Sequence, residues 1–259
     1  GGYVFLITRF IAQEKVFVAH TLEEQFFIAL SALEAQEAFH ATTFEHVRAI
    51  KDIFPILAGM TYLKDFGRLK ASTLHLHPDE SLRKALEQVE NFLKEHLVTI
   101  DRYGNHLTHT DFVPHNFRIA GHALYMLDCV PNYATIHFGN KYEGWARFLN
   151  YMLIHNPKLE KLLSEYIRHN RIEDEYLSLR LMRAYKIAFL LEFYAHALAK
   201  TSGDLHTLTL ARLRYWREAL TAVLEDHPLP ATVTERYVAT RDTLRSEEEK
   251  ARQREFAVA

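Results

Sequence analysis

Helical patterns fill most of the chain, and one central stretch interrupts them. From Asp101 to Gly139 the sequence turns to glycines, histidines and short extended pieces, whereas apolar residues recur at three- and four-residue spacing on both sides. Within this stretch, 117–119 and 124–127 are typical of two short strands. A fold with this pattern must hold its strands inside a body of helices. We therefore predict a mainly α protein with a small β insert.

The flanking helices have identifiable starts. Thr21 followed by Glu24 matches a capping box, and an apolar stripe then predicts a helix to about His40. Asp79 is a suitable cap for a second amphipathic helix. The segment 3–11 is β-branched and aromatic, so it is predicted to be a buried strand. The remaining predicted helices cover 44–54, 80–97, 141–155, 158–170, 173–201, 204–226 and 231–255.

Composition narrows the class of protein. With 259 residues, 48% of them hydrophobic, the chain can bury a large core, which excludes general disorder. A net charge of −2 provides no basic field for nucleic acid. The longest apolar stretch, 187–198, contains Glu192 and His196 and is too short to span a bilayer. With one cysteine, Cys129, and no signal-peptide pattern, we expect a soluble, cytoplasmic protein of undetermined oligomeric state, without nucleic-acid or membrane partners.

Three polar residues of the types used in phosphoryl transfer lie between His106 and Asp128. Asp111 and Asn116 are five residues apart across a loop that contains Pro114, and Asp128 follows an apolar strand. A carboxylate can orient an attacking hydroxyl and accept its proton, and amide and carboxylate oxygens suit Mg²⁺. The alternative is an Asx turn beside the proline, and it requires the spacing to Asp128 to be a coincidence.

The segment 109–116, HTDFVPHN, resembles the catalytic loop of aminoglycoside phosphotransferase and choline kinase-like enzymes, which have a protein kinase-like fold. These enzymes follow H-x-D-x-x-x-x-N, commonly with Pro two residues before the Asn. A metal-binding Asp follows about a dozen residues later, where Asp128 stands. The resemblance implies that Asp111 is the catalytic base and that Asn116 and Asp128 bind Mg²⁺. It also implies that His109 and Pro114 support the loop.

The same resemblance implies an organisation for the whole chain. Residues 1–12 would end a small lobe and form the hinge strand, and 13–230 would form the helical C-terminal lobe with its catalytic loop at 106–130. Beyond the part that the resemblance covers, the charged composition near the C-terminus predicts a charged helix over 231–259. The small lobe is then largely missing, so we expect a piece of a longer kinase. The nucleotide, ATP or GTP, would meet Thr8, Arg9, Phe10 and Leu127.

The resemblance is incomplete in three places. No strand-borne Lys and partner Glu precede the hinge, Asp128 is followed by Cys-Val in place of Phe-Gly, and Arg118 stands where an apolar residue usually lies under the adenine. We expect transfer of the γ-phosphate of ATP to a hydroxyl of a small molecule, such as an aminoglycoside, choline or a sugar-like compound. The missing Lys and Glu favour the alternative of a non-catalytic, kinase-like interaction module.

Three other patterns have competing interpretations. The 16 histidines include the pairs His75/His77 and His106/His109, which allow a His-based metal hydrolase or simply surface histidines. The acidic run 173–175 either attracts a cationic substrate or opens a helix, where acidic residues are favoured. The segment 142–147 either faces the acceptor or begins a helix with its tryptophan packed inward.

Overall fold

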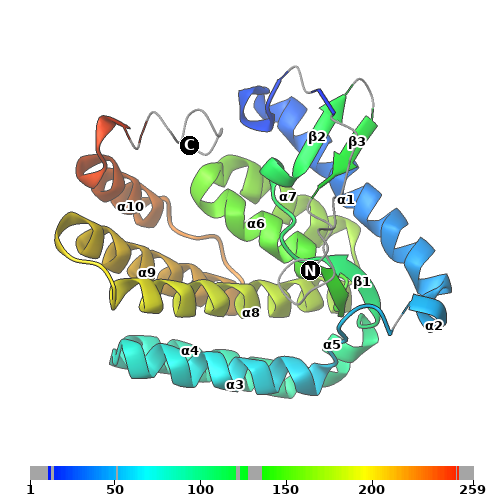
Figure 1. The fold of residues 1–259 in the computed structure, drawn as a ribbon, viewed down its shortest axis with the longest axis horizontal. Coiled ribbons are helices and arrows are strands. Elements are labelled where there is room, and N and C mark those ends of the chain that lie inside the picture. The colour runs from blue at the N-terminus through cyan, green and yellow to red at the C-terminus, as the bar shows by residue number, and fades with distance from the viewer. Residues whose placement is uncertain are drawn as a thin grey trace, which may run out of the picture.

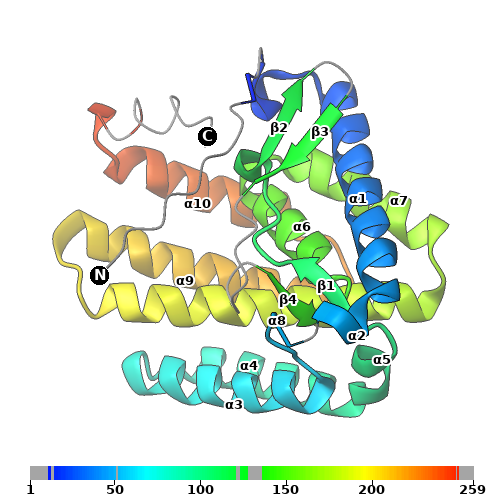
Figure 2. The ribbon, with the colours of Figure 1, turned by 45° about the vertical axis from the view of Figure 1, so that its right-hand side comes forward.

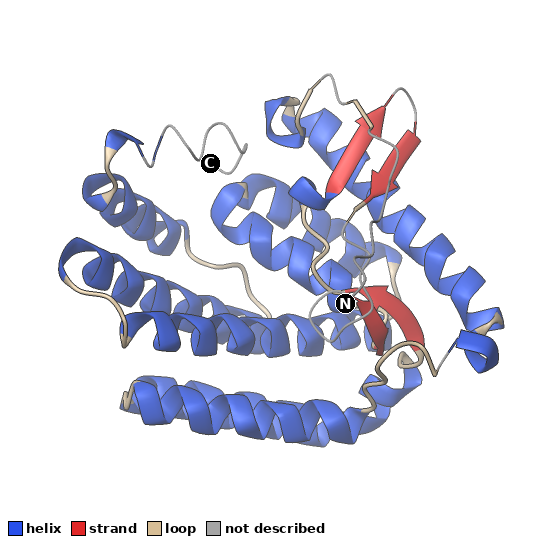
Figure 3. Cartoon of the chain, viewed as in Figure 1, coloured by secondary structure: helices blue, strands red, loops and turns tan. Residues whose placement is uncertain are grey.

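The computed structural model describes residues 11–12, 15–50, 52–120, 123–127, 136–248 and 250. Over these residues the chain is mainly helical, with two small antiparallel sheets that gather on one side of the helical body (Figure 3). This confirms the predicted mainly α class with a small β insert. The predicted strand 3–11 lies outside the described residues, except for Ile11. In the described part of the chain, no helix is long and apolar enough to cross a membrane.

Helix α1 (Leu22–Glu45) begins at the predicted capping box. The Thr21 hydroxyl accepts from the Glu24 amide at 3.3 Å, and the Glu24 carboxylate accepts from the Thr21 amide at 2.9 Å. The helix runs past His40, where the prediction ended it, because Gln36 and His40 continue the buried face although they are polar. The predicted helix over 44–54 was wrong in its continuity and its end: α1 runs to Glu45, α2 covers Val47–Ile50, and 52–54 form a turn. The chain that follows pairs with β4 through Leu57 and Phe138.

Three helices lead to the strands. α3 (Gly59–Leu76), which the sequence patterns did not reveal, is followed by α4 (Glu80–Glu95) and α5 (Leu97–Arg102). Asp79 caps α4 as predicted, since its carboxylate accepts from the Leu82 amide at 2.7 Å. The apolar stripe of α4 is fully buried, which confirms the prediction of an amphipathic helix. In Figure 1, α3 and α4 form a layer beneath α8 and α9, and both α3 and α4 pack against α8.

The β part of the described chain consists of two separate antiparallel pairs. β1 (His106–His109) pairs with β4 (Ile136–Gly139), and β2 (Phe117–Ala120) pairs with β3 (Ala123–Met126), both antiparallel. The second pair confirms the two predicted strands to within a residue. The first pair was not predicted, because β1 finds its partner almost thirty residues later in the chain. Since β1 ends at His109, this pairing fixes the point from which the 109–116 segment departs.

The C-terminal half is helical, as predicted, and α8 is its centre. α8 packs against α9, α6 and α3 and is buried over most of its length (Figures 1 and 2). One uninterrupted helix over 231–255 was wrong: α10 ends at Leu244, Arg245 is extended, and residues 247, 248 and 250 are helical again. Residues 251–255 lie outside the described part of the chain. The helices of this half are α6 (Glu143–His155), α7 (Pro157–Asn170), α8 (Glu173–Leu198), α9 (Gly203–Leu224) and α10 (Ala231–Leu244).

Candidate functional site

The segment between β1 and β2 brings Asp111 and Asn116 into direct contact. The Asn116 side-chain amide donates to the Asp111 backbone carbonyl at 2.8 Å and to its carboxylate at 3.2 Å. Apolar neighbours anchor the segment: Phe112, Val113 and Phe117 are buried in the core, whereas the two polar side chains stay half-buried. The amide oxygen of Asn116 is not used in either bond. It is the atom of this residue that could ligate a cation.

Pro114 shapes the middle of the same segment. It opens a 3₁₀ turn over Pro114–Asn116, where its fixed φ suits the first position and its missing N–H is not needed. The Asn116 amide closes this turn on the Val113 carbonyl at 2.9 Å. The local geometry is therefore a turn beside the proline, but within the described chain the Asp111 carboxylate accepts from the Asn116 and Arg147 side chains and not from a backbone amide, which the Asx alternative required. The turn also brings the side-chain amide of Asn116 to Asp111. A structural turn and a functional site are therefore compatible at this segment.

His109 and Asn116 together hold Leu127, the residue before the predicted metal ligand. A ring nitrogen of His109 lies 2.8 Å from the Leu127 carbonyl oxygen, and the Leu127 amide donates to the Asn116 carbonyl at 2.8 Å. Residues separated by up to 18 positions are thus tied to one another. Asp128 itself lies outside the described residues, as do Thr8, Arg9 and Phe10. Their predicted roles stay predictions.

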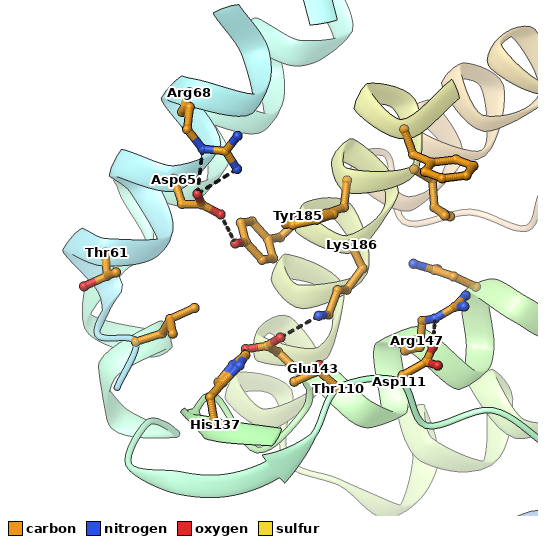
Figure 4. Close-up of a pocket in the computed structure, with 15 residues that line it drawn as sticks. Thr61, Asp65, Arg68, Thr110, Asp111, His137, Glu143, Arg147, Tyr185 and Lys186 are labelled. Atoms are coloured by element: carbon orange, nitrogen blue, oxygen red, sulfur yellow. Dashed lines mark hydrogen bonds and ion pairs between the residues drawn. The ribbon is translucent and has the colours of Figure 1, made fainter. Parts of the chain in front are cut away.

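Arg147, on the second turn of α6, provides the charged partner of Asp111. Its guanidinium donates to the Asp111 carboxylate at 3.0 Å, and both side chains are about two-thirds buried. The helix start over 142–147 packs Trp145 inward, as one of the two interpretations held, with Arg171 lying over its ring at 5.2 Å. The other interpretation, that this segment faces an acceptor, stays a prediction. Arg147 of the segment lines the cavity beside Asp111 (Figure 4).

A cavity of about 540 Å³ opens beside Asp111. This volume lies within the range of about 300–1,000 Å³ that is usual for small-molecule sites. Its wall combines three acidic and three basic side chains with aromatic residues from α8 (Figure 4). The lining residues are Leu57, Thr61, Asp65, Arg68, Thr110, Asp111, His137, Glu143, Arg147, Asn150, Tyr185, Lys186, Phe189, Leu190 and Phe193.

A second carboxylate, Glu143, forms the buried floor of this region. One of its oxygens accepts from Tyr62 and lies 2.7 Å from a ring nitrogen of His137, and the other lies 2.8 Å from the Lys186 ammonium. Burial alone would raise the pKa of Glu143, but His137 and Lys186 hold that pKa below its ordinary value. Burial raises the pKa of Tyr62 well above its ordinary range, so Tyr62 stays a hydrogen-bond donor.

Sequence reasoning missed this buried network. Its members come from α3, β4, α6 and α8, which no spacing rule connects. The one usable sign was Lys186, a lysine at the start of an apolar stretch, because a charge among apolar residues needs a partner. Gly144 marks the same place: a Cβ there would lie 2.7 Å from the His109 carbonyl oxygen, so α6 can approach β1 only with glycine at this position.

The other patterns are accounted for by local contacts. Arg118 donates to the backbone carbonyls of His115 and Phe117, at 3.1 and 2.8 Å. The acidic run opens α8, as the bland interpretation held, with Asp174 and Glu175 paired to Arg102 and Lys141 respectively. Among the described residues, no three or more His, Cys, Asp or Glu side chains gather in a way that could hold a metal ion.

Comparisons of the chain with protein family models, with characterised proteins and with solved structures found no match.

Proposed function

We propose that this protein is a small-molecule phosphotransferase with the large lobe of a protein kinase-like fold, of the aminoglycoside phosphotransferase and choline kinase-like type. One observation carries the proposal. The H-x-D-x-x-P-x-N segment is folded so that Asn116 bonds Asp111, and His109 and Asn116 both bond Leu127. An isolated turn would explain the first contact, but it would not need the other two.

The residues present are compatible with the Mg²⁺ that such a reaction uses. Asn116 spends its amide nitrogen on Asp111, which leaves its oxygen for a cation. Mg²⁺ retains several waters and takes one or two protein oxygen ligands, so a three-residue His or carboxylate cluster is not required. In this proposal Asn116 and Asp128 would hold the ion, which would supply positive charge beside the nucleotide phosphates.

Asp111 orients the acceptor in the proposed reaction. Its carboxylate accepts a hydrogen bond from the acceptor hydroxyl and receives the proton as the oxygen forms its bond to the γ-phosphorus of ATP. The bond from that phosphorus to the bridging oxygen breaks, and ADP leaves. Arg147 steers the Asp111 carboxylate through their 3.0 Å bond. Positioning and electrostatic stabilisation supply most of the rate in such reactions.

The cavity beside Asp111 favours catalysis over a purely structural, kinase-like module. A scaffold needs no hollow at this carboxylate, whereas an acceptor must reach it. In the cavity wall, Thr110 and Arg147 lie beside Asp111, and Asp65 of α3 lies on the far side (Figure 4). The acceptor is therefore assigned to this cavity.

Replacing Asp111 by asparagine tests the proposal. In the full-length protein, with ATP, Mg²⁺ and a panel of alcohols, D111N should lower phosphoryl transfer by about 10²- to 10⁴-fold, the usual contribution of a general base. Transfer is measured as labelled phosphate on the acceptor. The control is Asp174→Asn, which also removes an ion-paired carboxylate, 27% exposed against 31% for Asp111, and should keep wild-type activity. Equal activity in both variants would refute the proposal, as would absence of transfer in the wild type.

A further inference from the structure

The charges that line the cavity are already matched to one another. Asp111 pairs with Arg147 at 3.0 Å, and Glu143 pairs with Lys186 at 2.8 Å. In the remaining pair, Arg68 lies 3.1 Å from Asp65, which also accepts from Tyr185. Among the described lining residues there are thus three carboxylates and three cations, each acid bonded to a base of the same wall.

One side of the cavity is an aromatic ladder on α8, which is buried at Tyr185 and exposed at Phe189 and Phe193. Tyr185, Phe189 and Phe193 follow one another at four-residue spacing, so they project from one face of the helix. Phe189 is 44% exposed and Phe193 is 63% exposed, although both line the cavity. The rings of Tyr185 and Phe189 meet edge to face at 6.2 Å. A flat apolar ligand that covered these rings would remove apolar area from water.

We propose that the acceptor is an uncharged alcohol with an aromatic or similarly flat apolar body. Its hydroxyl lies at Asp111, and its apolar body rests on Phe189 and Phe193. The placement of the hydroxyl rests on the proposed function, whereas the neutral, aromatic character rests on the wall itself. Both ends are within one cavity of about 540 Å³.

Polycationic acceptors fit this wall poorly. The carboxylates of Asp65, Asp111 and Glu143 already have cationic partners, so a polycation would have to displace those partners. The cost is highest at Glu143, because its carboxylate is fully buried. Exposed aromatic faces can also attract a single quaternary ammonium. That attraction is countered here by Arg68, Arg147 and Lys186 in the same wall. A neutral ligand meets neither cost.

Two glucosides test the aromatic preference without any turnover. Phenyl β-glucoside and methyl β-glucoside carry the same sugar hydroxyls, and only the first has an aromatic ring. Binding to the full-length protein is measured by titration calorimetry in the absence of nucleotide, with kanamycin and choline as the cationic comparison. We expect phenyl β-glucoside to bind about tenfold more tightly than methyl β-glucoside, which is the factor that one well-covered ring contributes. Kanamycin and choline should bind more weakly than phenyl β-glucoside.

Two matched phenylalanines locate the binding. Phe193→Ala should weaken binding of phenyl β-glucoside by about fivefold or more, since the ring it removes covers the ligand. Phe27→Ala is the control: Phe27 is 66% exposed on α1, stacks edge-on with a neighbouring ring as Phe193 does, and does not line the cavity. It should leave the affinity unchanged.

The outcomes separate this inference from the proposed function. Tighter binding of kanamycin or choline than of phenyl β-glucoside, equal affinity for the two glucosides, no binding of either, or equal effects of F193A and F27A would each overturn the inference. Binding as expected with no phosphoryl transfer to any alcohol would overturn the proposed function alone. Transfer that depends on Asp111 but prefers cationic acceptors would overturn the inference alone.

Discussion

Two carboxylates line the same cavity, and their surroundings differ. Asp111 is 31% exposed and is bonded to Arg147 and Asn116, which are themselves partly exposed. Glu143 is fully buried and has Tyr62, His137 and Lys186 around it. A carboxylate open to the cavity can exchange a partner for a ligand. A carboxylate enclosed by partners holds four elements together, so its contribution is to the stability of the fold.

Mutation should therefore distinguish the Asp111 carboxylate from the Glu143 carboxylate. Loss of Asp111 should remove activity and leave the fold, whereas loss of Glu143 should weaken the fold. Both are acidic and both line the cavity, so residue type and position in the wall do not distinguish them. The separation rests on burial and on the number of partners.

The largest effect on stability is expected from Glu143→Gln. This change leaves Lys186 and His137 beside a neutral group, and breaking a buried ion pair costs about 3–5 kcal/mol. Urea unfolding should show that loss, while Asp111→Asn should lose less than about 1 kcal/mol because its pair is partly exposed.

A second substitution checks the cause of that loss. Adding Lys186→Met to Glu143→Gln removes the charge left without a partner, so the double variant should be less destabilised than the sum of the two single variants. Additive losses, or equal losses for the Glu143 and Asp111 variants, would remove the distinction between the two carboxylates.

The free energy of unfolding should depend on pH in the acid range because of Glu143. Because its folded pKa lies below the ordinary value of 4.5, the unfolded chain takes up a proton first as the pH falls. The stability from this group is present above about pH 4.5 and is lost below it, at up to about 1.4 kcal/mol per pH unit.

Glu143→Gln should therefore flatten the loss of stability below pH 4.5 and leave the profile from pH 6 to 8 parallel to that of the wild type. Urea unfolding at a series of pH values measures this. A variant whose acid profile stays parallel to the wild type throughout would show that Glu143 is not held ionised in the folded protein.

The smallest effect is expected from Arg147→Met, which tests whether the Asp111 pair is exchangeable. The side chain is three-quarters buried, but its partner faces the cavity, so we expect less than about 1 kcal/mol of lost stability. Phosphoryl transfer should fall by about tenfold, because one hydrogen bond that orients Asp111 is lost.

Stability is measured by urea unfolding and transfer by steady-state kinetics. The conservative Arg147→Lys keeps a charge but loses the geometry of the guanidinium, so it should recover only part of the activity. Full activity in Arg147→Met would show that Arg147 does not contribute to the proposed reaction.

Much of the fold could be anticipated from local patterns. The capping box at Thr21, the stripe of α4 and the strands around 120 depend on neighbours a few residues away, and the structure has them where they were expected. Prediction failed where distant partners decide. Gln36 looks like a break in the α1 stripe, yet it is buried because it donates to Thr108 and to the His109 carbonyl, both at 3.4 Å.

The polar residues of the 109–116 segment lie close together in the chain, so their proximity could be predicted from the sequence. Asp111, Pro114 and Asn116 lie within six residues, and a proline-led turn brings the two polar groups together by short-range geometry alone. The partners of these groups come from far away. Arg147, Lys186 and the aromatic ladder of α8 reach the cavity because helices pack, and packing depends on shape and burial over the whole molecule. Charge pairing and cavity shape are therefore properties of the folded chain, whereas the type and spacing of the polar groups in this segment belong to the sequence.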